Sequence, residues 1–137
     1  MTYNLDRFVT AQQSSYAQAL AEIEAGRKRT HWMWFVFPQL KGLGYSSTAQ
    51  FYGLSGIAEA EAYLAHPVLG PRLVQIATAA LQHPEKTPLE LFGSPDNLKF
   101  QSCMTLFACL PQTDPLFRKA LETFFSGTED AGTLRLL

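Results

Sequence analysis

The residue types best suited to chemistry are concentrated between Lys28 and Gln39, where basic residues directly precede both tryptophans of the chain. Ammonium and guanidinium groups bind phosphate or carboxylate, and indole rings stack on planar groups or cations. His31 lies between the two kinds of residue and can transfer protons. This segment therefore predicts one wall of a binding site. Its expected ligand contacts are Lys28, Trp32, Trp34 and Gln39. The alternative is that the aromatic residues are core and the basic run is solvated.

A second charged group lies at the start of a helix predicted over about 95–110. At about 100° per residue, Asp96 and Lys99 share the apolar face of this helix. An unpaired ammonium on an inward face is costly, so Lys99 needs either Asp96, one turn away, or an anion-binding cavity. We predict that Lys99 joins segment 28–39 in one cleft, where Asp96 and Asp130 are further acid/base groups. The alternative is that this pair caps the helix and snorkels.

Two further residues are expected to contact an anion. Ser46 ends a loop with two glycines, which permit close backbone approach, and offers its hydroxyl to an anion or to the next helix start. Arg72 lies at the margin of an apolar helix face and adds a cation. The histidines show no zinc-site spacing with cysteines or carboxylates, so we expect no metal and no cofactor.

Helices must position these residues, because four windows have helical periodicity and none alternates with period two. The expected helices cover residues 5–25 (as one or two), 47–53, 57–65, 67–82, 88–92, 95–110 and about 115–127. Ser94 and Asp114, each followed by proline, are predicted helix starts. The run 31–37 is apolar nearly all round and fits a helix or a strand. We predict an all-α, single-domain orthogonal bundle of five to eight helices over residues 1–137.

Composition excludes several classes of protein. A chain of 137 residues with 47% hydrophobic residues suffices for one core. A formal charge of −1 provides no global field for a polyanion, so nucleic acid is not an expected partner. We find no leader-like or membrane-spanning run, and we expect a cytoplasmic protein with reduced cysteines and no membrane partner.

Short motifs spread over nearly the whole chain occur together in one family. They include Lys28 with 31–35, 37–39, 42–44 with Ser46, His66-Pro67, Phe92-Gly93 with Asp96 and Lys99, 104–107, and Thr133-Leu134. Through them the sequence resembles a bacterial family of uncharacterised proteins, a domain of unknown function often mislabelled calpastatin. The resemblance implies an all-α fold and no established activity. From Lys99 onward, the chain is also similar to the NADAR group of ADP-ribose-processing proteins, but it lacks their upstream glutamate-bearing segment.

Together, these features predict a cleft for a small anionic ligand. A nucleotide-derived molecule such as ADP-ribose or NAD suits cations beside indole rings, and the reaction would be hydrolytic if the protein is an enzyme. The alternative is a non-catalytic protein–protein interaction module, whose exposed aromatic residues would form the binding patch.

Overall fold

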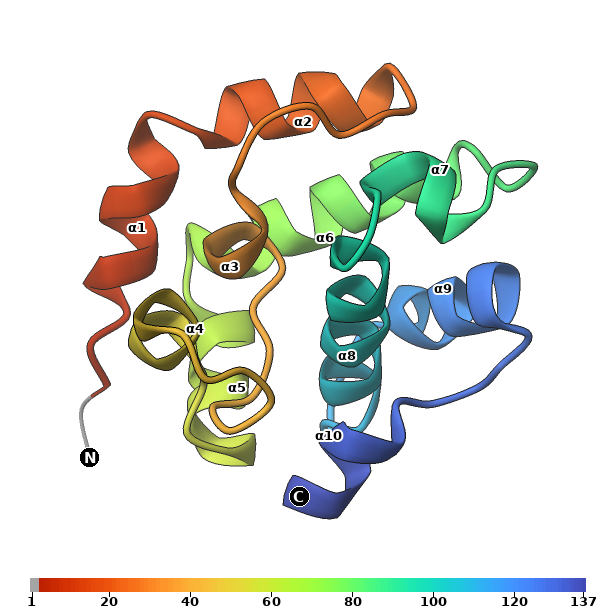
Figure 1. Cartoon of the computed structure of the whole chain (residues 1–137). Coiled ribbons are helices and arrows are strands. Elements are labelled where there is room, and N and C mark those ends of the chain that lie inside the picture. The colour runs from red at the N-terminus through yellow and green to blue at the C-terminus, as the bar shows by residue number, and fades with distance from the viewer. Residues whose placement is uncertain (1–2) are drawn as a thin grey trace.

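Ten helices and one isolated β-bridge make up residues 3–137, the part of the chain described by the structure, a computed structural model (Figure 1). In chain order they are α1 (Asp6–Gln13), α2 (Tyr16–Glu24), α3 (Met33–Val36), α4 (Ser47–Tyr52), α5 (Ile57–Ala65), α6 (Leu69–Leu81), α7 (Pro88–Phe92), α8 (Asp96–Ala108), α9 (Pro115–Phe125) and α10 (Ala131–Leu136). The all-α prediction is confirmed. The predicted number of five to eight helices is wrong, because the apolar run and the C-terminal tail form two further short helices, α3 and α10.

Capping side chains explain where several helices begin. In each case a side-chain oxygen accepts a hydrogen bond from an amide of the first turn, which otherwise has no partner. These caps are Ser46 for α4, Thr87 for α7, Asp114 for α9 and Asp130 for α10. The predicted start at Ser94 is wrong, because α8 begins after Pro95 and no side chain caps it.

The longer helices cross one another around one core. Figure 1 shows α2 above α6, and α8 near the centre with α7 above it, α9 beside it and α10 below it. Phe100 of α8 lies at the middle of an aromatic cluster, 5.3 Å from Phe37 and 4.4 Å from Phe92 between ring centroids. Leu106, Phe107 and Leu121 are fully buried in this core. Within residues 3–137, no helix has the length and apolar character needed to cross a bilayer.

Helices α5 and α6 approach each other closely at Gly70. A β-carbon at this position would lie 2.0 Å from the carbonyl oxygen of Leu64. Backbone atoms cannot move aside as a flexible side chain can, so we expect Gly70→Ala to lower the free energy of unfolding by about 1–3 kcal/mol in chemical denaturation. Gly56→Ala is the control, because nothing lies within 4 Å of a β-carbon there. Equal effects of the two substitutions would contradict this account of the α5–α6 contact.

Candidate functional site

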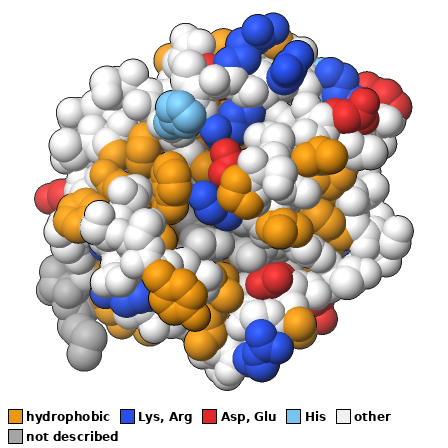
Figure 2. Space-filling view, viewed as in Figure 1, with side chains coloured by type: hydrophobic (Ala, Val, Ile, Leu, Met, Phe, Trp, Pro, Cys, Tyr) orange, Lys and Arg blue, Asp and Glu red, His pale blue; other side chains and the backbone are white. Residues whose placement is uncertain are grey.

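A cleft of about 530 Å³ opens where the 39–49 loop, the start of α8 and helix α10 meet. Figure 2 shows this face, on which basic and acidic side chains lie beside hydrophobic ones around a recess. The polar lining residues are Gln39, Tyr45, Ser46, Lys99, Ser102, Asp130 and Arg135. The apolar ones are Trp34, Leu43, Gly44, Ala49, Pro95, Leu98 and Gly132. The wall thus combines cations, aromatic surface and hydrogen-bonding groups.

Backbone pairing holds the loop side of the cleft. The amide of Leu54 donates to the Gln39 carbonyl at 2.9 Å, and the amide of Lys41 donates to the Leu54 carbonyl at 2.8 Å. At the other end of the loop, the Ser46 hydroxyl accepts from the Ala49 amide at 3.1 Å and so begins α4. Of the two uses expected for this hydroxyl, the structure therefore has the helix cap. The loop is therefore anchored at both ends.

Lys99 is the central cation of the cleft. Its Nζ lies 3.9 Å from the centroid of the Trp34 ring and 3.3 Å from Oδ1 of Asp96. The other oxygen of Asp96 is 2.9 Å from the Nζ of Lys28. The three side chains are largely buried, with 19% of Lys99, 16% of Asp96 and 7% of Lys28 exposed. Two ammonium groups thus share one carboxylate, which leaves an uncompensated positive charge beside the cleft.

Asp130 adds a fixed carboxylate to the wall of the cleft. Its Oδ2 accepts hydrogen bonds from the hydroxyl of Ser102 at 3.1 Å, from the amide of Thr133 at 2.9 Å and from the Thr133 hydroxyl at 2.6 Å. Its own amide donates to the buried Thr105 hydroxyl at 2.9 Å. No hydrogen bond within residues 3–137 involves Oδ1. This oxygen is available to accept from a hydroxyl group or a water molecule in the cleft.

Buried Glu22 of α2 organises the segment that leads to the cleft. Its carboxylate accepts from the amide of Arg29 at 2.7 Å, from the amide and hydroxyl of Thr30 at 3.0 and 2.6 Å, and from Nε1 of Trp32 at 2.9 Å. Burial alone would raise the pKa of Glu22, but these hydrogen bonds and one from Gln18 lower it to about 2. The carboxylate stays ionised and fixes the chain just before Trp34.

The structure brings together five of the predicted site residues, which come from four separate parts of the chain. These are Trp34, Gln39, Ser46, Lys99 and Asp130. The expected joining of the 28–39 segment to Lys99 is therefore found for Trp34 and Gln39. Asp96 does not line the cleft, but its carboxylate forms an ion pair with Lys99.

The remaining predicted residues lie elsewhere. Trp32 is 1% exposed and cannot stack on a ligand, because its ring packs in the core 6.2 Å from that of Phe37 and its Nε1 donates to Glu22. His31 is exposed and does not line the cleft, and Lys28 lines a different hollow. The guanidinium of Arg72 lies 5.0 Å from the centroid of the Tyr16 ring and 3.4 Å from Oε1 of Gln12. These four residues do not line the cleft.

Sequence analysis missed several residues of the wall, chiefly Tyr45, Leu98, Ser102 and Arg135. A usable signal existed for Arg135. Asp130 is a good N-cap residue, and a short helix that begins after it has Arg135 in its last turn. Ser102 lies on α8 one turn beyond Lys99. Within residues 3–137, His, Cys, Asp and Glu side chains form no group of three or more suited to a metal ion.

Comparisons with known proteins identify a family without a known activity. The family model described as "Protein of unknown function (DUF1810)" matches residues 2–137. The crystal structure of the conserved hypothetical protein Rv1873 from Mycobacterium tuberculosis is 47% identical in sequence, with a TM-score of 0.96. That match covers 98% of this chain and 96% of the other. The search of curated proteins gave no match. The family resemblance predicted from the motifs is thereby confirmed for a family of unknown function.

Proposed function

We propose that this chain, which belongs to the DUF1810 family of proteins of unknown function, binds a small anionic molecule in the cleft beside Lys99. The observation that carries this proposal is the sharing of Asp96 between Lys28 and Lys99. One carboxylate cannot neutralise two ammonium groups, and charge–charge interactions are stronger at a largely buried site than in water. An anion next to Lys99 would neutralise the remaining positive charge.

The other cleft residues support a ligand that also has a planar group and hydroxyls. Trp34 and the 86% exposed ring of Tyr45 offer aromatic surface, and Arg135 offers a second cation. Oδ1 of Asp130 would accept from a ligand hydroxyl. A nucleotide-derived molecule such as ADP-ribose has all three groups, and the similarity of the C-terminal part to the NADAR group agrees with this class. In a hydrolytic reaction, Asp130 would accept a proton from the attacking water.

One observation favours a second function, docking of a partner protein. Tyr45 is 86% and Leu98 is 57% exposed, and both line the same cleft. Exposed apolar residues around a depression are common at protein interfaces. In this case the charged residues of the cleft would determine which partner binds. Small anions alone would then not stabilise the fold.

A thermal-shift screen against nucleotides, ADP-ribose, NAD and sugar phosphates tests the proposal. A ligand present at about 100 times its dissociation constant stabilises the fold by about 2.7 kcal/mol, which raises the melting temperature measurably. We expect Lys99→Met to abolish this shift and to leave the fold intact, because Asp96 keeps Lys28 as its partner. Lys119→Met is the control, since Lys119 is exposed on α9 and does not line the cleft. The proposal fails if no compound shifts the protein or if Lys99→Met responds like the wild type.

A further inference from the structure

A second hollow, of about 420 Å³, lies where the chain leaves α2 and meets α7. Its lining residues are Arg27, Lys28, Lys86, Leu89, Glu90 and Gly93. Half of them are cations contributed by two segments that are far apart in the sequence. The proposed function does not use this hollow, because its ligand contacts Lys99 in the cleft.

Two of the three cations are held in place by backbone carbonyls. The Nζ of Lys86 donates to the Gly26 carbonyl at 2.9 Å. The contact is close: a β-carbon on Gly26, whose φ is +87°, would lie 2.6 Å from this nitrogen. The Nζ of Lys28 donates to the Thr30 carbonyl at 2.6 Å, and the amide of Lys28 donates to the Leu91 carbonyl at 2.7 Å. Ordered cations lose little further entropy when they bind an anion.

These cations have few carboxylate partners. Within residues 3–137, neither Arg27 nor Lys86 forms an ion pair, and Lys28 shares Asp96 with Lys99. Glu90 also lines the hollow, but its carboxylate accepts from the Thr87 amide at 2.8 Å as part of the α7 capping box. The lining side chains thus have three positive charges and one negative charge.

We propose that this hollow is a second anion site and that it binds a phosphate group. Arg27 and Lys86 have no carboxylate partner within residues 3–137, so a phosphate anion would balance their charge, and the planar guanidinium of Arg27 with two ammonium groups provides several donors for phosphate oxygens. The phosphate can be free or can be the phosphoryl end of a larger molecule. In either form, its contacts are Arg27, Lys28 and Lys86.

Titration followed by NMR amide signals tests this site on the full chain. Inorganic phosphate and glycerol 3-phosphate are added separately at pH 7, with ionic strength kept constant by chloride because salt screens exposed charges. We expect the amides of Lys86, Glu90 and Gly93 to shift saturably. The double variant Arg27→Gln/Lys86→Gln should bind about tenfold more weakly or worse, because it loses two charge-assisted contacts. The control Arg29→Gln removes a neighbouring exposed charge outside the hollow and should change the affinity by about twofold or less.

Each outcome decides one point. Tighter binding of inorganic phosphate supports free phosphate as the ligand, and tighter binding of glycerol 3-phosphate supports a phosphoryl group. An absence of saturable shifts, or equal affinities in the double variant and the wild type, would overturn the proposal. If the double variant does not fold, Arg27→Gln alone is used, because this side chain is exposed and should weaken binding by itself. Shifts confined to Gly44 and Gly132 would support phosphate binding in the cleft but overturn this second site. Shifts confined to Gly93 would support the second site and not the cleft.

Discussion

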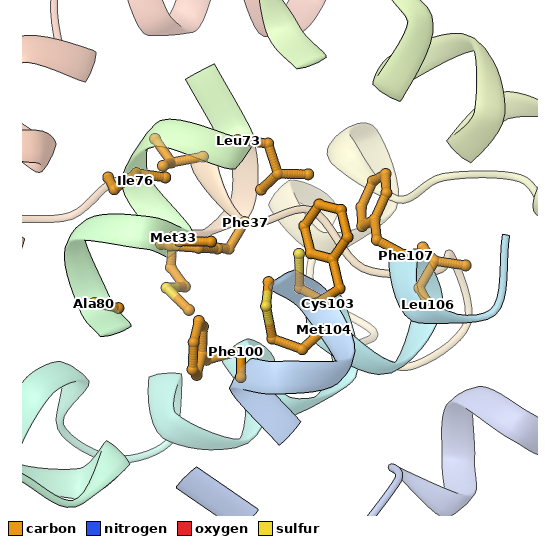
Figure 3. Close-up of a cluster of buried hydrophobic side chains, with 14 of the residues drawn as sticks. Met33, Phe37, Leu73, Ile76, Ala80, Phe100, Cys103, Met104, Leu106 and Phe107 are labelled. Atoms are coloured by element: carbon orange, nitrogen blue, oxygen red, sulfur yellow. The ribbon is translucent and has the colours of Figure 1, made fainter. Parts of the chain in front are cut away.

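Replacing Phe107 with alanine is expected to lower the free energy of unfolding by about 3–5 kcal/mol, because the substitution leaves a large cavity in the core. The ring is fully buried, and its centroid lies 5.7 Å from that of Tyr63 and 5.5 Å from that of Phe117. Figure 3 shows Phe107 beside Leu106 in a cluster that extends through Cys103 and Met104 to Phe100. Chemical denaturation measures the change.

The control for this experiment is Phe51→Ala, which removes a ring that is 56% exposed. We expect a loss of about 1 kcal/mol or less, since less apolar surface is returned to water. A loss below about 1 kcal/mol for Phe107→Ala would contradict the burial of this side chain.

Replacing Glu22 with alanine is expected to cost at least about 3 kcal/mol of stability. The substitution leaves the buried Trp32 indole nitrogen and the part-buried amides of Arg29 and Thr30 without their acceptor, and an unsatisfied donor that is fully buried costs about 1–3 kcal/mol. Denaturation of Glu22→Ala and of the control Glu24→Ala measures the effect. Glu24 lies on the same helix, but its side chain is exposed, so its loss should change stability by about 0.5 kcal/mol or less.

The contribution of Glu22 should also depend on pH. Its pKa falls from 4.5 to about 2 on folding, so the unfolded chain binds the proton more readily than the folded chain does. The stabilisation is therefore complete above about pH 4.5 and is lost as the pH falls towards 2. At about 1.36 kcal/mol per pKa unit, roughly 3 kcal/mol disappears over this range. A difference between wild type and Glu22→Ala that stays constant from pH 6 to pH 2.5 would contradict this assignment.

Most of the helices could be predicted because their signals are local. The cap at Asp114 and the apolar faces of α6 and α9 depend only on neighbours in the sequence. Residues 31–37 could not be assigned, since a run that is apolar on all sides has no period. Packing decides its conformation: Glu22 holds the chain before it, and Val36 and Phe37 enter the core.

The candidate site was predictable only in part, for a geometric reason. The cost of an unpaired inward ammonium left two partners open for Lys99, Asp96 or an anion-binding cavity, and suggested a cleft shared with segment 28–39. In the structure Lys99 pairs with Asp96 and lies beside Trp34. The spacing of residues 28–39 does not distinguish the two tryptophans. The burial of Trp32 and the position of Trp34 in the cleft depend on the single turn of α3 and on the Glu22 carboxylate that accepts from Trp32. The packing of α2 on α6, a contact between distant parts of the sequence, places Arg72 beside Tyr16.

The place of α10 also affects how this protein should be handled in the laboratory. Gly132 and Arg135 line the cleft, and Leu137 lies two residues after Arg135. An affinity tag fused after Leu137 would lie close to Arg135 in sequence. An acidic tag there would compete with an anion for Arg135, and a histidine-rich tag would offer the anion further binding groups. Binding assays therefore call for a protein whose C-terminal tag has been removed by a protease, since a residual tag would mask the affinity being measured.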